Sequence, residues 1–182
     1  MSDTIMMRIR IALPLTLVTL ALSTWTGLAH AASSTISAVI PWQGQGQIFP
    51  VDTNKLRFLG SLEGIMYVEN AEGEMNEAFV RCPIVQNIDT ADGSTSASGN
   101  CVIVVSAEDS IFAELTCNGI AGLCRGEFKL TGGTGRFAGI SGSSKMTIRS
   151  PVHALAANLS EGTVVHVAAG ILQIPELKYS LP

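Results

Sequence analysis

A run of glycines between two alternating segments constrains the fold of this chain most. In residues 126–130, Phe128 and Leu130 share one face and Glu127 and Lys129 share the other, which is the period of a β-strand. That period stops at a glycine cluster. Glycine reaches positive φ without a steric penalty, so the cluster predicts a tight turn formed by Gly132, Gly133 and Gly135.

Alternation resumes at Phe137 and continues toward Arg149, which predicts a return strand and therefore a hairpin. The return strand carries Gly139 and Gly142. Glycine inside a strand marks a sharp bend or the close approach of another backbone. Similar glycines recur in earlier strand-like segments, as small barrels require.

The sequence pattern predicts short strands separated by turn residues along the chain. We expect strands within residues 36–50, 55–69, 78–88, 101–105, 111–117, 126–130, 145–157 and 163–174, with a small polar leader at 32–41 and an extended tail at 175–182. Pro83 lacks an amide donor, so we expect a bulge or a sheet edge there. No amphipathic helix is expected. The prediction is an all-β fold, a closed eight-stranded antiparallel barrel rather than a sandwich.

The first residues have the pattern of a signal peptide, which we place at residues 1–31. Arg8 and Arg10 precede an apolar run from Ile11 to Leu22, and Ala29-His30-Ala31 fits a cleavage site. The run is shorter than the roughly 20 residues that span a bilayer, although an uncleaved anchor is the alternative. Residues 32–182 would then form a single barrel domain, periplasmic or secreted, without a membrane span.

The balance of charged residues excludes one class of binding partner. Residues 1–31 contain Arg8, Arg10 and Asp3, so of 11 basic and 15 acidic residues in the chain, 9 and 14 remain after cleavage. This acidic balance, without a basic cluster, argues against nucleic-acid binding.

The four cysteines all follow the expected cleavage site, and an even number in an oxidising compartment predicts disulfides. Of the three possible pairings we favour Cys82–Cys101 between neighbouring strands and Cys117–Cys124 across a short hairpin. A four-thiolate zinc site is the alternative, but its closely spaced pairs are missing, so we expect no metal.

The residues 126–142 resemble the Gly-Gly-Thr-Gly-[Arg/Lys]-Phe segment of the allene oxide cyclase/dirigent superfamily, with its exported bacterial members most similar. The resemblance implies an eight-stranded barrel with a hydrophobic central cavity, often trimeric, and metal-independent steering of a reactive substrate. The acidic residues attributed to dirigent proteins have no counterpart here. Arg136 matches the basic position of the motif.

Several other motifs match known binding or catalytic patterns only in part. The glycine cluster is followed by a strand rather than the helix of a nucleotide-binding loop. Gly139-Ile140-Ser141-Gly142-Ser143 departs from the nucleophile elbow. We expect ordinary roles for His153 and His166, a plain turn at Asp89–Gly93 rather than a calcium loop, and a polar turn at the sequon Asn158-Leu159-Ser160.

Arg136 is the one candidate ligand-binding residue, because a guanidinium at a barrel mouth can hold a carboxylate; pairing with turn carbonyls or a surface carboxylate is the simpler alternative. We expect no catalytic residue and no cofactor. The predicted function is an exported, non-catalytic barrel that binds a small apolar ligand or serves a structural or interaction role, with a cyclase or dirigent-like enzyme as the alternative.

Overall fold

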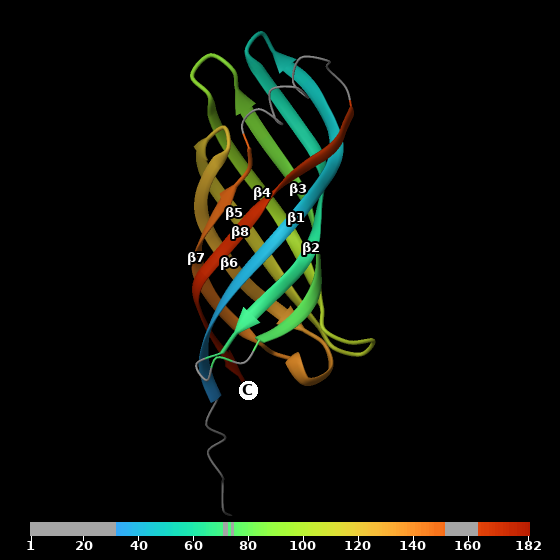
Figure 1. Cartoon of the computed structure of the whole chain (residues 1–182), viewed down its shortest axis with the longest axis vertical. Helices are drawn as coiled ribbons and strands as arrows, with labels where there is room; N and C mark the ends of the chain where they lie inside the picture. Colours follow the sequence, from blue (N-terminus) through green and yellow to red (C-terminus); the bar gives the residue numbers. More distant parts are fainter. Residues whose placement is uncertain (1–31, 71–72, 74, 152–163) are drawn as a thin grey trace, which may run out of the picture.

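The computed structural model describes residues 32–70, 73, 75–151 and 164–182, with the backbone alone at 32 and 164–167. Eight antiparallel strands follow one another around a closed barrel (Figure 1). Their bounds are β1 Ala32–Asp52, β2 Lys55–Glu69, β3 Met75–Asp89, β4 Ser94–Val104, β5 Ser110–Ile120, β6 Leu123–Gly133, β7 Ser141–Arg149 and β8 Val164–Leu181. The predicted fold class is therefore confirmed.

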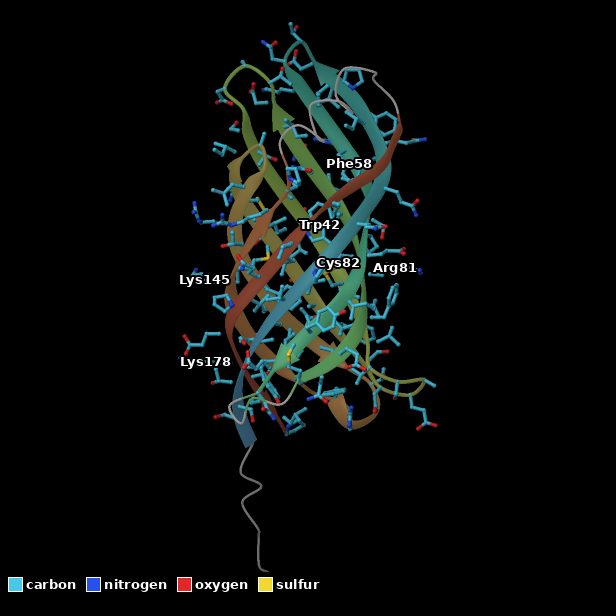
Figure 2. All side chains as sticks on the ribbon, in the orientation of Figure 1. Trp42, Phe58, Arg81, Cys82, Lys145 and Lys178 are labelled. Atoms are coloured by element: carbon cyan, nitrogen blue, oxygen red, sulfur yellow. A yellow bond between two sulfur atoms is a disulfide. The ribbon has the colours of Figure 1, made fainter. Side chains whose placement is uncertain are left out.

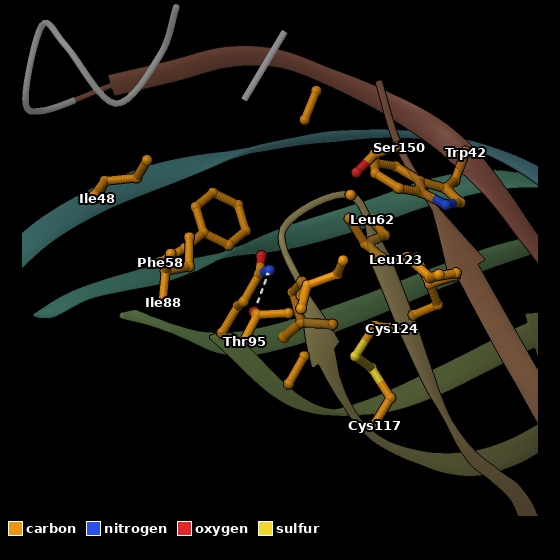
Figure 3. Close-up of a pocket in the computed structure, with 17 residues that line it drawn as sticks. Trp42, Ile48, Phe58, Leu62, Ile88, Thr95, Cys117, Leu123, Cys124 and Ser150 are labelled. Atoms are coloured by element: carbon orange, nitrogen blue, oxygen red, sulfur yellow. Dashed lines mark hydrogen bonds between the residues drawn. A yellow bond between two sulfur atoms is a disulfide. The ribbon is translucent and has the colours of Figure 1, made fainter. Parts of the chain in front are cut away.

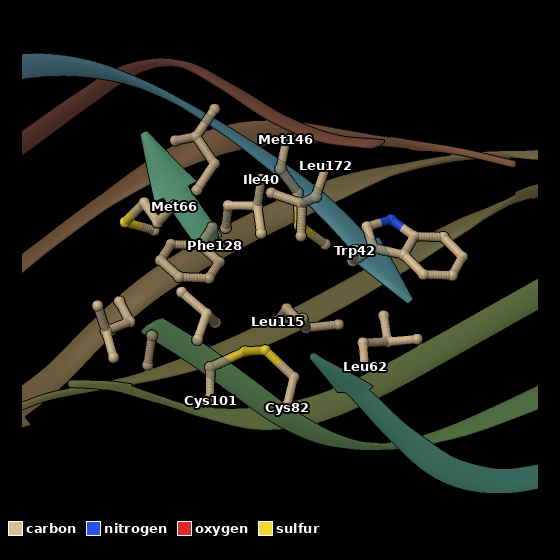
Figure 4. Close-up of a cluster of buried hydrophobic side chains, with 14 of the residues drawn as sticks. Ile40, Trp42, Leu62, Met66, Cys82, Cys101, Leu115, Phe128, Met146 and Leu172 are labelled. Atoms are coloured by element: carbon tan, nitrogen blue, oxygen red, sulfur yellow. A yellow bond between two sulfur atoms is a disulfide. The ribbon is translucent and has the colours of Figure 1, made fainter. Parts of the chain in front are cut away.

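Strict alternation builds the core. Along β3, for example, Ala78, Val80, Cys82 and Ile84 are buried while the residues between them are exposed. The same pattern on every strand fills the middle of the lumen, where Phe128 and Ile174 are fully buried and Leu115 is 1% exposed (Figure 4). The barrel therefore has a packed interior over most of its length.

The two disulfides join the predicted pairs and lie inside the barrel. Cys82 of β3 bonds Cys101 of β4, and Cys117 of β5 bonds Cys124 of β6. All four cysteines are at most 6% exposed, so the bridges are part of the core and not of the surface; Figure 4 shows the Cys82–Cys101 bridge among the core side chains.

Several expected strand ends were wrong; β4, for example, begins at Ser94 rather than at Cys101. The polar leader at residues 32–41 is strand, because it pairs with the C-terminal tail, Ala32 opposite Leu181 and Ile36 opposite Leu177. The tail is in turn the end of β8. The return strand after the glycine cluster begins only at Ser141, because one turn of 3-10 helix, η1 (Gly135–Phe137), precedes it.

Pro83 is neither at an edge nor at a bulge. It pairs with Ser61 of β2, and the register of β3 with β4 is the same before and after it, from Arg81 opposite Val102 to Ile84 opposite Gly99. The Cys82–Cys101 bridge, with its Cα atoms 4.1 Å apart, lies next to the proline. A covalent link thus holds the two strands together where an amide donor is lacking.

Candidate functional site

The core leaves one end of the lumen incompletely filled. A pocket of about 60 Å³ opens there, close to the turn between β5 and β6 (Figure 3). Apolar side chains from all eight strands line it, together with the Cys117–Cys124 bridge; Ile120 ends β5 and Leu123 begins β6 on either side of the turn. The large apolar wall residues of β1 to β3 are Trp42, Ile48, Phe58, Leu62, Ile84 and Ile88.

Three polar residues contribute to the pocket: Gln86, Thr95 and Ser150. Gln86 Nε2 donates to Thr95 Oγ1 at 2.8 Å, and the Thr95 hydroxyl donates to the carbonyl oxygen of Asn87 at 3.0 Å (Figure 3). Thr95 is only 7% exposed, so this chain of hydrogen bonds satisfies a buried hydroxyl. No ionisable side chain is among the described residues that line the pocket.

Trp42 is the aromatic side chain that separates the pocket from the packed core. Its indole ring lies against Gly170 of β8, where a Cβ would collide with the ring carbons Cζ2 and Cε2. Its Nε1 is buried and has no hydrogen-bond partner in the described part of the chain. A buried unpaired donor costs about 1–3 kcal/mol, so Trp42 is held there by its packing rather than by a hydrogen bond.

The glycine-rich motif lies at the other end of the barrel, with η1 and the C-terminus (Figure 1). Thr134 Oγ1 donates to the carbonyl of Glu108 and accepts the amide of Ser110, both at 2.9 Å. Gly135 has a φ of 56°, a left-handed conformation that favours glycine. The motif therefore fastens the β6–β7 connection to the β4–β5 turn.

Arg136 takes part in the same fastening and is remote from the pocket. Its Nε lies 3.2 Å from Asp109 Oδ2, its backbone amide donates to Asp109 Oδ1 at 3.0 Å, and its guanidinium lies over the Phe137 ring. Arg136 therefore pairs with a carboxylate, that of Asp109, which is one of the alternatives that the sequence left open. A ligand-binding role for Arg136 stays a prediction.

The other glycines of the motif lie in turns or against a neighbouring strand. Gly132 and Gly139 also have positive φ, and Gly142 packs against the backbone of Lys178 and Tyr179. Ser141 Oγ is 3.2 Å from Ser180 Oγ on the barrel surface. His153 and the sequon Asn158-Leu159-Ser160 lie outside the described residues, as do the His166 side chain and the predicted signal peptide.

The acidic turn between β3 and β4 uses its own carboxylates. Asp89 Oδ1 accepts the amide of Ala91 at 2.9 Å, and Asp92 Oδ1 accepts the amide of Ser94 at 2.8 Å. Such bonds are typical of aspartate in tight turns. Among the described residues, no three His, Cys, Asp or Glu side chains come together as metal ligands would.

The resemblance implies a hydrophobic central cavity, but the sequence does not predict the position of this pocket. Alternation identifies Trp42, Phe58 and Ile88 as inward-facing, but it does not say at which height the lumen stops being filled. That depends on the stagger between strands far apart in sequence.

Comparison of the chain with protein-family models, with curated proteins and with solved structures gives no match. Among the described residues, no helix has the length and apolar character needed to cross a bilayer.

Proposed function

We propose that this protein is an exported, non-catalytic barrel that binds the apolar end of a small molecule, such as an alkyl or acyl chain, in the pocket at one end of its lumen. The observation that carries the proposal is that pocket, apolar on most of its wall and placed where an otherwise packed barrel opens. Small barrels are suited to holding one small ligand in this way.

The size of the pocket limits the ligand. An apolar cavity of about 150 Å³ is enough for benzene, and this pocket measures about 60 Å³. It has room for a short run of methylene groups and not for a fused ring system. The Gln86 amide and the Ser150 hydroxyl lie on its wall and can hydrogen-bond a hydroxyl or carbonyl group of the ligand.

Export fits the two internal disulfides, since such bonds form and persist in oxidising compartments. The cyclase or dirigent-like alternative needs a group that moves a proton or steers charge beside the substrate. The described residues that line the pocket offer only an amide and hydroxyl groups, and none of these groups is ionised at neutral pH. Binding without turnover is therefore the function that this geometry supports best.

A series of straight-chain alcohols tests the proposal. The chain has two tryptophans, Trp25 and Trp42, and Trp25 lies in the predicted signal peptide, so in the exported form all indole emission comes from the pocket wall. We expect 1-hexanol, 1-octanol and 1-decanol to change this emission saturably. Each buried methylene should lower the dissociation constant about fourfold, from roughly 0.8 kcal/mol per group, until the pocket is full and the gain stops.

Matched variants on β4 provide the control. Ala97 lines the pocket, while Ser98, the next residue, is exposed on the outer face. Ala97→Phe should fill the pocket and abolish the emission change, and Ser98→Phe should leave it intact. A response that grows with chain length without levelling off, or that survives Ala97→Phe, would contradict the proposed site. Conversion of a bound unsaturated substrate, seen by mass spectrometry, would favour the enzyme instead.

A further inference from the structure

The outer surface of the barrel is divided into an apolar face and a polar face. Outward side chains of β6 and β7 are polar throughout: Arg125, Glu127, Lys129, Thr131, Ser141, Ser143, Lys145, Thr147 and Arg149. By contrast, large apolar side chains, each 38–44% exposed, gather on the strands from β8 through β1 to β5. We call this set the apolar face: Val39, Ile65, Tyr67, Phe79, Val102, Val104, Phe112 and Ile171.

The strand register makes the apolar face continuous. Val39 is opposite Tyr67, Ile65 is opposite Phe79, and Phe79 is opposite Val104. On the next pair of strands Val102 is opposite Phe112. Directly opposed residues on one face of a sheet are within contact distance, so these side chains form a single band across the barrel wall. The largest apolar patch on a soluble protein is often functional.

A hollow adjoins the band. A groove of about 650 Å³ runs over β8, β1, β2 and β3, bounded by Pro41, Ile65, Tyr67 and Phe79. Its floor includes Gly64, where β2 lies so close to β1 that a Cβ would collide with the carbonyl oxygen of Pro41. A convex barrel touches another convex body over little area, and this hollow offers space for projecting side chains of a partner.

The charges on β3 indicate which partner fits. Glu77, Phe79 and Arg81 are successive outward residues, all exposed, so Phe79 is flanked by an acid on one side and a base on the other. Arg81 Nε also bonds Glu63 Oε1 at 2.7 Å, and its guanidinium lies 5.6 Å from the centre of the Phe79 ring. Figure 2 shows Arg81 on the side of the barrel opposite Lys145 and Lys178.

We propose that the apolar face is the contact between two copies of this chain, related by a twofold axis that passes Phe79 perpendicular to β3. In that arrangement Phe79 packs on Phe79 of the second copy, and each Glu77 faces the Arg81 of the other, because the two β3 strands run in opposite directions. The surface is thus complementary to itself in both shape and charge, as a twofold contact requires. An aromatic residue and an arginine at its centre are typical of binding hot spots.

The apolar face supplies a little over half of the area that a standard dimer contact needs. Aromatic side chains bury about 150–250 Å² when fully covered. At about 40% exposure, eight large side chains present on the order of 500 Å², and a standard interface needs about 800 Å² per partner. Polar neighbours such as Gln43, Glu63 and Glu77 supply the rim.

Sedimentation velocity of the full chain in its exported form measures the association directly. We expect a dimer at micromolar concentration. Phe79→Asp should weaken the dimer at least about 30-fold, as loss of a hot spot does, without unfolding an already exposed position. The control, Ser143→Asp on the polar face, should leave the dimer unchanged. A monomer at all concentrations, a trimer, or equal effects of both variants would overturn the proposal.

A charge exchange tests whether Glu77 faces Arg81 of the second copy. Glu77→Arg alone brings two arginine side chains together at each of the paired contacts, and Arg81→Glu alone brings two glutamates together there. Each variant by itself should therefore dimerise about tenfold more weakly, because like charges then face each other across the contact. Mixed together, the two variants form a heterodimer in which the new arginine at position 77 of one copy faces the new glutamate at position 81 of the other.

The mixture accordingly restores opposite charges at that contact and leaves the native Glu77 and Arg81 of the two variants paired at the other. The heterodimer should return to the parent affinity, which sedimentation velocity of the equimolar mixture measures. A mixture that dimerises as weakly as either variant alone would contradict the pairing of Glu77 with Arg81 across the contact.

Discussion

Asp92 shows how a single turn residue couples the fold to pH. The Ser94 backbone amide, with a further contribution from the Ser94 hydroxyl, holds the pKa of the Asp92 carboxyl below its ordinary value of 3.8. A carboxyl whose pKa is lower in the folded state stabilises the fold above the unfolded pKa, and this contribution is lost as the pH falls through the folded pKa. The turn between β3 and β4 should therefore loosen only in that acidic range.

Carbon-detected NMR titration of the aspartate side chains measures this directly. We expect the Asp92 resonance to titrate with a midpoint below 3.8, and the Ser94 amide shift to follow the same curve. In Asp92→Asn the Ser94 amide should show no transition over that range. A midpoint at or above 3.8 would contradict the stabilising bond to Ser94.

At the scale of residues, the sequence predicts partners well where chemistry leaves few choices. Four cysteines allow three pairings, and hairpin spacing selects the right one. Arg136 is harder, because its partner Asp109 comes from a different turn, 27 residues earlier. Only closure of the barrel brings those two turns to the same end.

Among the structural elements, the connection between β6 and β7 depends on Thr134. Its hydroxyl bridges two backbone groups of the β4–β5 turn, the carbonyl of Glu108 and the amide of Ser110. Thr134→Val keeps the shape and removes both bonds, which should cost about 1–2 kcal/mol in the free energy of unfolding. Urea denaturation measures this loss, and faster hydrogen exchange of the Ser110 amide locates it.

Thr131→Val is the matched control, since Thr131 is exposed on the outer face of β6 three residues earlier. It should change stability by less than about 0.5 kcal/mol, as surface substitutions usually do. Equal losses for the two variants would mean that the Thr134 bonds do not hold the turns together.

Strand interiors follow from alternation, but strand ends do not. The small polar residues 33–35 lack a sequence signal for a strand, and they form one by pairing with residues 178–180 of the C-terminal tail. Pro83 illustrates the converse. A proline normally argues for an edge, and here the neighbouring disulfide and a closed sheet override that preference.

For the whole molecule, glycine and alternation together were sufficient to predict closure into an eight-stranded barrel. They did not predict where the lumen is hollow or which outer face is apolar. Both features depend on register between strands, since the apolar face joins residues from β8 and from β1 to β5. A change of two residues in any register would scatter that face.

We therefore expect the two disulfides to maintain the register of the strands. Removing each disulfide in turn tests this expectation. Cys82–Cys101 closes a loop of 19 residues and Cys117–Cys124 one of 7. Chain entropy then predicts that the two double-alanine variants lose about 3.2 and about 2.4 kcal/mol of unfolding free energy.

We expect the unfolding free energies of the two variants to differ by more than this, because Cys82–Cys101 also joins β3 to β4 beside Pro83, where an amide donor is missing. Guanidinium unfolding of both double variants gives the comparison, and restoring an amide with Pro83→Val should narrow the gap. A Cys117→Ala/Cys124→Ala variant that proves the less stable of the two would show that the bridge beside the pocket, and not the one beside the proline, maintains the register of the barrel.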